Sequence, residues 1–153
     1  MNTLYEVYLK SGFKALKCAG YHPSQNKESD PKKKYKRAKE SITRGFTDPN
    51  YNGLTVKECE LWESPGGWIG WVIPKGYIAI DVEDPESISY LKSLCQGKEI
   101  KPPEHNTNQG KHFIFKTNKN LPGDSELFTK CGIKVTYRAG GKNYLILAPT
   151  NGR

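Results

Sequence analysis

The chain has 153 residues with a hydrophobic share of 35%, including three Trp, nine Tyr and five Phe, which predicts one folded domain with its own core rather than a disordered chain. Its formal net charge of +8 favours a polyanionic partner. No stretch reaches the roughly 18 apolar residues of a membrane span, and the first residues lack the pattern of a signal peptide, so we expect a cytoplasmic protein with no membrane partner.

The first predicted elements are a helix and a strand. Thr3 and Glu6 have the spacing of a capping box, and the helix that they open is expected to end at Gly12. The stretch FKALKCA then alternates in the manner of a strand. Residues 20–50, rich in Lys, Ser, Asn, Asp and Pro, predict one long loop.

This loop carries the strongest cluster of charge in the chain, with seven basic residues and one acid between Lys32 and Arg44. Such a cluster can neutralise phosphates and release their counterions, which predicts DNA binding. The alternative is a solvated loop, which is the usual role of a lone run of charge. The predicted DNA-binding residues are Lys32, Lys33, Lys34, Lys36, Arg37, Lys39 and Arg44.

The middle of the chain predicts two helices with a β-hairpin between them. Thr55 and Glu58 repeat the capping-box spacing. GGWIGWVIP and KGYIAIDVE are apolar strands separated by residues 74–76, which predicts a tight hairpin. Asp84 followed by Pro85 predicts the start of the second helix. The side chains that this helix is expected to bury are Ile88, Leu91, Leu94 and Cys95.

Three more strands are expected towards the C-terminus. KHFIFK is one, and GIKVTYRAGGKNYLILAPT holds two that are joined by a turn at Gly140 and Gly141. The mixture of helices, strands and hairpins predicts an α+β fold. The cysteines show no CxxC pair, so we expect reduced and mostly buried thiols. These are Cys18, Cys59, Cys95 and Cys131.

Two acids stand at the end of the apolar strand that contains residues 77–82. Alternate strand residues share a face, so Asp81 and Glu83 are expected to project together while Ile80 and Val82 face the other side. Two neighbouring carboxylates repel unless a cation lies between them, and Mg²⁺ takes such oxygen ligands together with substrate phosphates. The alternative is that the acids only mark where the strand leaves the core.

A polar turn precedes the strand KHFIFK, which begins beside His112. Turn N–H groups, including that of Gly110, and an imidazole can together bind phosphate. A lone histidine at the start of a strand is more often a structural hydrogen-bonding residue. Arg138 and Lys142, near the last predicted turn, could offset the charge of a triphosphate or could simply be exposed hairpin residues.

In order, these motifs resemble the prim-pol domain of bifunctional DNA primase-polymerases, in the archaeo-eukaryotic primase superfamily. The matching stretches are YLKSGFKAL, GGWIGWVIPKGYIAIDVED, NQGKHFIF and YRAGGKNYLILAPTNGR. The resemblance implies one prim-pol domain over residues 1–153, with an RRM-like catalytic sheet, flanking helices and a second small α/β lobe. It implies that Asp81 and Glu83 bind Mg²⁺ or Mn²⁺ and that His112 contacts the phosphates of the incoming nucleotide.

The same resemblance implies binding partners, a reaction and a longer parent protein. The partners are a single-stranded or primed DNA template and nucleoside triphosphates, and the reaction is two-metal nucleotidyl transfer. The chain is then the N-terminal part of a longer replication protein of a phage or mobile element, with a helicase domain further along.

The third motif departs from the family. Relatives carry an acid on the strand before the glycine-rich hairpin, where this chain has KVTYR and the matching position is Thr136. Three outcomes follow: two acids suffice, a different acid completes the site, or efficient catalysis is lost. One alternative function, favoured by Thr136 and the basic loop, is a silent prim-pol-like DNA-binding module for replication initiation. A separate alternative is a metal-dependent nuclease that uses Asp81 and Glu83, with His112 as the candidate general base.

Overall fold

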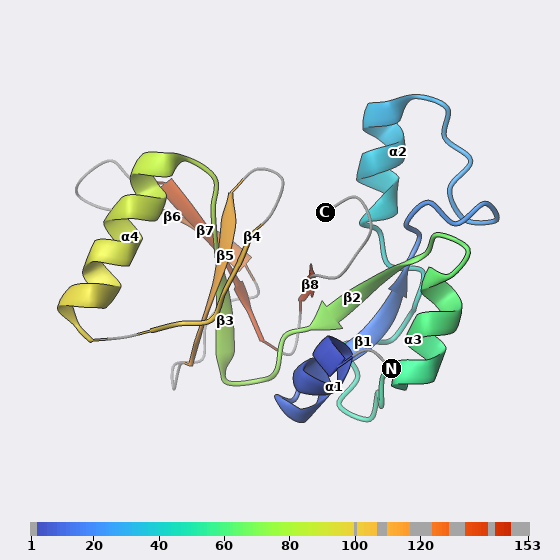
Figure 1. Ribbon diagram of the computed structural model, residues 1–153, viewed down its shortest axis with the longest axis horizontal. Coiled ribbons are helices and arrows are strands. Elements are labelled where there is room, and N and C mark those ends of the chain that lie inside the picture. The colour runs from blue at the N-terminus through green and yellow to red at the C-terminus, as the bar shows by residue number, and fades with distance from the viewer. Residues whose placement is uncertain are drawn as a thin grey trace. The chain divides into compact units, whose positions relative to one another are not determined.

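The computed structural model describes residues 3–99, 101–106, 110–116, 124–128, 134–140 and 143–147. Within these residues the chain is a mixed α+β protein with two antiparallel sheets and four helices (Figure 1). Its internal contacts group into two compact units, Met1–Pro74 with Tyr144–Arg153, and Lys75–Asn143. The predicted α+β class is confirmed. The specific prim-pol fold and its extent as one domain stay predictions.

The first unit has a three-stranded sheet in the order β1-β2-β8. A capping box opens α3, with the Thr55 hydroxyl accepting from the Glu58 N–H and the Glu58 carboxylate accepting from the Thr55 N–H. Gly12 follows α1 with φ of +93°, which supplies the left-handed conformation that ends a helix. The elements of this unit are α1 (Thr3–Lys10), β1 (Lys14–Cys18), α2 (Pro31–Ala38), α3 (Val56–Glu63), β2 (Trp68–Val72) and β8 (Tyr144–Ile146).

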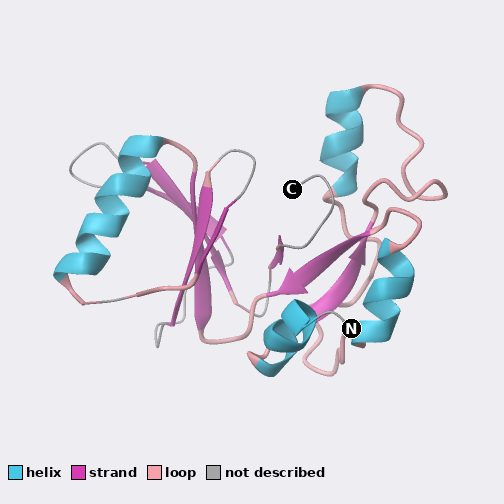
Figure 2. Cartoon of the chain, viewed as in Figure 1, coloured by secondary structure: helices cyan, strands magenta, loops and turns pink. Residues whose placement is uncertain are grey.

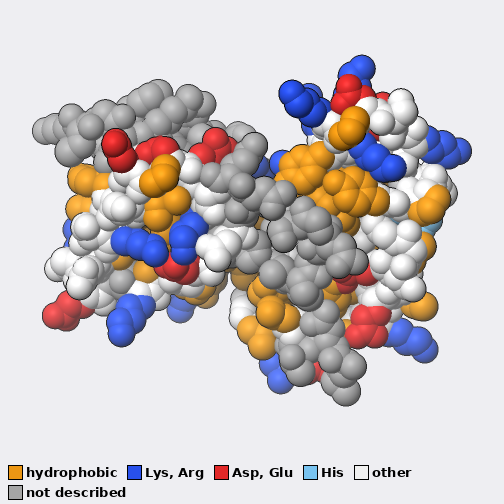
Figure 3. Space-filling view, turned by 45° about the horizontal axis from the view of Figure 1, so that its top comes forward, with side chains coloured by type: hydrophobic (Ala, Val, Ile, Leu, Met, Phe, Trp, Pro, Cys, Tyr) orange, Lys and Arg blue, Asp and Glu red, His pale blue; other side chains and the backbone are white. Residues whose placement is uncertain are grey.

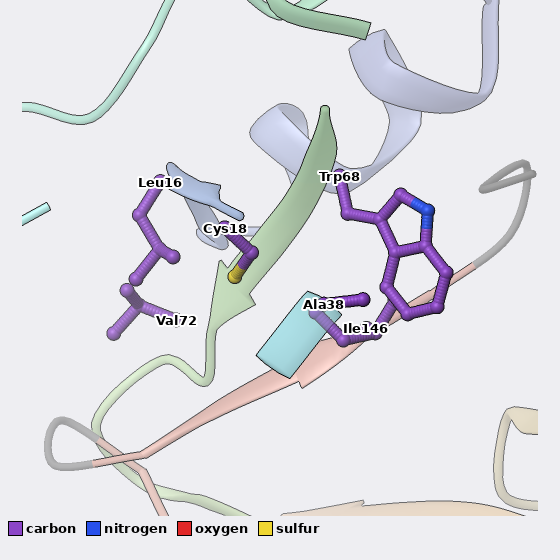
Figure 4. Close-up of a cluster of buried hydrophobic side chains, with 6 residues drawn as sticks. All are labelled: Leu16, Cys18, Ala38, Trp68, Val72 and Ile146. Atoms are coloured by element: carbon purple, nitrogen blue, oxygen red, sulfur yellow. The ribbon is translucent and has the colours of Figure 1, made fainter. Parts of the chain in front are cut away.

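The core of the first unit lies around β2, whose five residues are all buried. One cluster of its side chains is shown in Figure 4 and consists of Leu16, Cys18, Ala38, Trp68, Val72 and Ile146. Burial raises the pKa of the Cys18 thiol. Cys18, Cys59 and Cys95 are free and buried, as predicted, whereas Cys131 lies outside the described residues.

The prediction of one unbroken loop over residues 20–50 is wrong, because α2 forms within it (Figure 2). The Asp30 carboxylate caps this helix by accepting from the N–H groups of Lys32 and Lys33. Tyr35 packs against the core cluster and Ala38 is fully buried within it. Only these two inward positions are apolar, so the hydrophobic pattern of the helix is too sparse to detect in the sequence.

The second unit has a five-stranded sheet in the order β4-β5-β3-β7-β6. Its helix α4 (Pro85–Gly97) covers one face, where Ile88 and Leu91 pack against buried Val82 and Phe113. The expected burial of Leu94 is wrong, because its side chain is 42% exposed. The strands are β3 (Tyr77–Val82), β4 (Glu104–Asn106), β5 (Lys111–Lys116), β6 (Asp124–Phe128) and β7 (Lys134–Ala139).

Both predicted hairpins of apolar strands are wrong. β2 pairs with β1 and β8, whereas β3 pairs with β5 and β7. Likewise, β7 pairs with β3 and β6, and β8 pairs with β2. β2 and β3 are therefore central strands of separate sheets, although only a short segment separates them in the sequence.

Candidate functional site

Asp81 lies in the central strand of the second unit, next to two of the residues that the sequence singled out. Its cross-strand partner on β5 is His112, and its partner on β7 is Thr136. Directly paired residues of an antiparallel sheet project from the same face. That face is the one opposite α4, because the residues that pack against α4 occupy the alternate positions of β3 and β5.

His112 and Asp81 are close in space as well as in register. The His112 Nε2 atom lies 3.6 Å from Asp81 Oδ1, which is longer than a hydrogen bond but short enough for electrostatic interaction. The His112 side chain is 6% exposed and that of Asp81 is 21% exposed. The pair therefore combines a buried imidazole with a carboxylate that solvent can still reach.

Glu83 and Asp84 follow the strand rather than continue it, because β3 ends at Val82. Glu83 is exposed. Asp84 caps α4 as predicted, with its carboxylate accepting from the Ser87 N–H at 2.8 Å. Hydrogen bonds from the Ser87 side chain and backbone hold the pKa of Asp84 below its usual value. Asp84 therefore has a structural role, and Asp81 and Glu83 are the two acids left for a cation.

The glycine of the turn before β5 packs directly against this strand end. A Cβ atom at Gly110 would lie 2.0 Å from the carbonyl oxygen of Val82 and 2.6 Å from the Cα atom of Glu83. No side chain fits in that space. The absence of a Cβ at residue 110 thus allows the backbone of Gly110 to lie against the end of β3, at Val82 and Glu83.

We expect Gly110→Ala to destabilise the protein by about 1–3 kcal/mol, because the added methyl group forces the turn away from β3. Gly97→Ala is a matched control, since a Cβ there meets no atom within 4 Å and alanine favours a helix. Urea unfolding of both variants measures the effect. An unchanged midpoint for Gly110→Ala would contradict the close packing of the turn.

The cations near the site divide into three cases. Arg138 pairs with Ala79 on β3, so its position shares the face of Asp81. Lys142 lies outside the described residues. Lys111 pairs with Val82 on the α4 face, and its Nζ atom lies 2.7 Å from a Glu104 carboxylate oxygen. This hydrogen bond lowers the pKa of Glu104 and raises that of Lys111. Lys111 therefore belongs to a local ion pair. It was not among the predicted site residues.

Sequence reasoning missed two further members of the cross-strand row. Position 126 on β6 pairs with position 136, and position 105 on β4 pairs with His112. The row therefore runs His105, His112, Asp81, Thr136, Glu126 across the five strands. Neither β4 nor β6 was predicted, so no sequence signal placed residues 105 and 126 in this row.

Two carboxylates suit a cation whose remaining ligands come from the substrate. Within the described part of the chain, no group of three or more His, Cys, Asp and Glu side chains is arranged to hold a metal ion. Asp81 and Glu83 offer hard oxygen ligands, one partly buried and one exposed, and Mg²⁺ commonly binds one or two carboxylates together with phosphate oxygens. Their chemistry suits Mg²⁺ or Mn²⁺ better than a metal that requires nitrogen or sulfur ligands.

The predicted DNA-binding residues lie in the first unit. Six of the seven belong to α2 or to its C-cap Lys39, and Arg44 is exposed further along the chain. A cavity of about 400 Å³ lies in the second unit, between the C-terminal part of α4 and β4, and is lined by Lys92, Gln96, Glu99, Lys101, Pro102 and Glu104. It includes no residue of the cross-strand row, so we do not assign it to the candidate site.

None of the helices in the described ranges has both the length and the apolar character that crossing a membrane requires. Comparisons of the chain with protein-family models, with curated proteins and with solved structures found no match.

Proposed function

We propose that this chain is a template-dependent DNA primase-polymerase domain that joins nucleoside triphosphates to a 3′-hydroxyl and releases pyrophosphate. The observation that carries the proposal is the placement of Asp81 beside His112 on one sheet face, with Gly110 packed against the end of the same strand. A carboxylate can bind a divalent cation, and an imidazole and backbone N–H groups can bind the phosphate oxygens of a triphosphate.

In this proposal, Asp81 and Glu83 hold a divalent cation against the phosphates of the nucleotide. Bound Mg²⁺ or Mn²⁺ supplies positive charge that lowers the pKa of the attacking hydroxyl and stabilises charge on the phosphoryl oxygens. His112 donates a hydrogen bond to the triphosphate, and its low exposure reduces competition from water. Arg138, on the same face, adds positive charge for the phosphates.

A second candidate is a silent DNA-binding module for replication initiation. It is favoured by the register, because Thr136 is directly opposite Asp81, where an acid would add a ligand and a negative charge. Both candidates use DNA as the partner. Only the first predicts synthesis.

Incubation of the chain with primed and unprimed single-stranded DNA, labelled nucleotides and Mg²⁺ or Mn²⁺ tests the proposal. We expect primer extension or new primers, and both should require the template and the metal. EDTA should abolish both. Binding without synthesis would instead support the silent module. Degradation of the template would support the metal-dependent nuclease that the sequence left open.

A further inference from the structure

The six cations of α2 and its C-cap separate into two sets that differ in what their side chains contact. The Arg37 guanidinium donates to the carbonyl of Gln25 and pairs with Glu40. The Nζ atom of Lys34 lies 5.8 Å from the ring centroid of Tyr21, and that of Lys39 lies 4.3 Å from that of Tyr35. These three cations therefore interact with the protein itself.

The remaining cations of α2 have no such contacts. Lys32, Lys33 and Lys36 are exposed. Lys36 follows Lys33 by three residues and Lys32 by four, so it is a neighbour of both on the helix surface. Among the residues that the structure describes, none forms an ion pair or a side-chain hydrogen bond with these three ammonium groups. We call them the lysine triad. Lys and Arg side chains gather around α2 in the upper right of Figure 3.

The helix that carries the triad is fixed to the first unit at several points. The buried Asn26 amide donates to the carbonyls of Gly20 and Lys34, at 2.7 and 2.8 Å. The Tyr144 hydroxyl donates to the carbonyl of Lys39 at 2.8 Å. With Ala38 in the core, these contacts hold α2 in place. A held helix presents its charges at fixed positions, which reduces the entropy lost when a partner binds.

We infer that the lysine triad is the surface that contacts the phosphates of the DNA backbone, while Lys34, Arg37 and Lys39 stabilise the fold through contacts within the protein. The inference rests on the proposed DNA partner and narrows the seven predicted residues to a specific face of one helix. Like charges three and four residues apart destabilise a helix, and no described acid forms an ion pair with these three ammonium groups. A chain of phosphates offsets all three at once and gains the entropy of the released counterions.

An anionic membrane fits this face less well. Helices that lie on membranes insert large apolar side chains beside their cations. The large apolar side chain of α2, Tyr35, packs inward against the core cluster. The exposed face of α2 consists of Pro31 and the triad. A nucleic-acid backbone needs only the charges, so we commit to DNA as the occupant.

The test measures binding of the full chain to a labelled oligothymidine strand and to a duplex of equal length, in EDTA and without nucleotides, over a series of KCl concentrations. For Lys32→Gln/Lys33→Gln/Lys36→Gln, we expect the slope of log affinity against log salt to fall by about 2 on the single strand and about 2.7 on the duplex. Affinity for the single strand at 0.1 M salt should fall roughly a hundredfold.

Lys10→Gln/Lys57→Gln/Lys98→Gln is the charge-matched control, because these lysines are exposed and belong to α1, α3 and the C-cap of α4 rather than to α2. It should change the slope by less than half as much. Lys34→Gln/Lys39→Gln should lower the melting temperature and leave the slope nearly unchanged. Equal changes in the triad variant and the control would overturn the inference, since net charge alone would then explain binding. Triad-dependent binding to phosphatidylserine vesicles but not to DNA would also overturn it.

The outcome of this experiment does not depend on the proposed catalysis, because the binding assay involves neither metal nor synthesis. Extension activity with an unchanged salt slope in the triad variant would overturn only the inference. A triad-dependent salt slope in a chain that never extends a primer would overturn only the proposed catalysis.

Discussion

Asp81→Asn should reduce primer extension by at least about a hundredfold, which is the scale of losing one electrostatic contact to a transition state. The amide keeps the shape of the side chain and removes its charge, so the cation loses a ligand while the sheet keeps its packing. Because the Asp81 side chain is partly exposed, the free energy of unfolding should change by less than about 1 kcal/mol.

Glu86→Gln is the matched control for charge, because Glu86 is an exposed acid in the first turn of α4. It should leave extension unchanged. Extension rates, calorimetric titration with Mn²⁺ and thermal melting of both variants separate catalysis from stability. If Asp81→Asn and Glu83→Gln both bind Mn²⁺ as tightly as the unsubstituted chain does, the two acids are not the cation site and the proposed chemistry is wrong.

Thr136→Asp should strengthen divalent binding by about thirtyfold. The position pairs directly with Asp81, and directly paired residues have Cβ atoms about 5 Å apart. A carboxylate about 4 Å from a divalent ion gains about 2 kcal/mol even at the dielectric constant of water. Without metal, the new carboxylate repels Asp81, so the variant should melt at a lower temperature in EDTA and recover with Mg²⁺.

Thr136→Asn controls for shape without adding charge, and it should leave both metal affinity and the EDTA melting temperature nearly unchanged. Primer extension then distinguishes the two candidate functions. A rise in activity identifies a site that lacks its third acid. A collapse of strong activity in Thr136→Asp would contradict this identification and show that the site is already complete. Position 126, two strands and about 10 Å from Asp81, would then be the next acid to substitute.

Local chemistry in the sequence was sufficient to predict three helices and the acids at the strand end. The capping box at Thr55 and the cap at Asp84 depend on residues within one turn of each other, so both appear in the structure where they were expected. The α+β class followed from the same local patterns. The helix α2 was missed because its cations outnumber its two inward apolar side chains, and its stability depends on distant groups such as Tyr144.

The candidate site was only partly predictable. Asp81, Glu83, Gly110 and His112 could be named from their residue types and neighbours, but the sequence could not say that they meet. That Asp81 pairs with both His112 and Thr136 is a property of strand register. Register depends on which face of a strand is buried, as β3 and β5 are against α4, rather than on any local signal.

The sequence by itself thus determined the helix caps, the apolar runs and the excess of positive charge, since each depends on residues close together in the chain. Only the tertiary structure decided that β2 and β3 belong to different sheets, and that the lysine triad is presented to solvent while Lys34, Arg37 and Lys39 contact the protein. The reason is physical. Strand partners and the contacts of long side chains are chosen by burial and charge among segments distant in sequence, and that competition is settled only when the whole chain has folded.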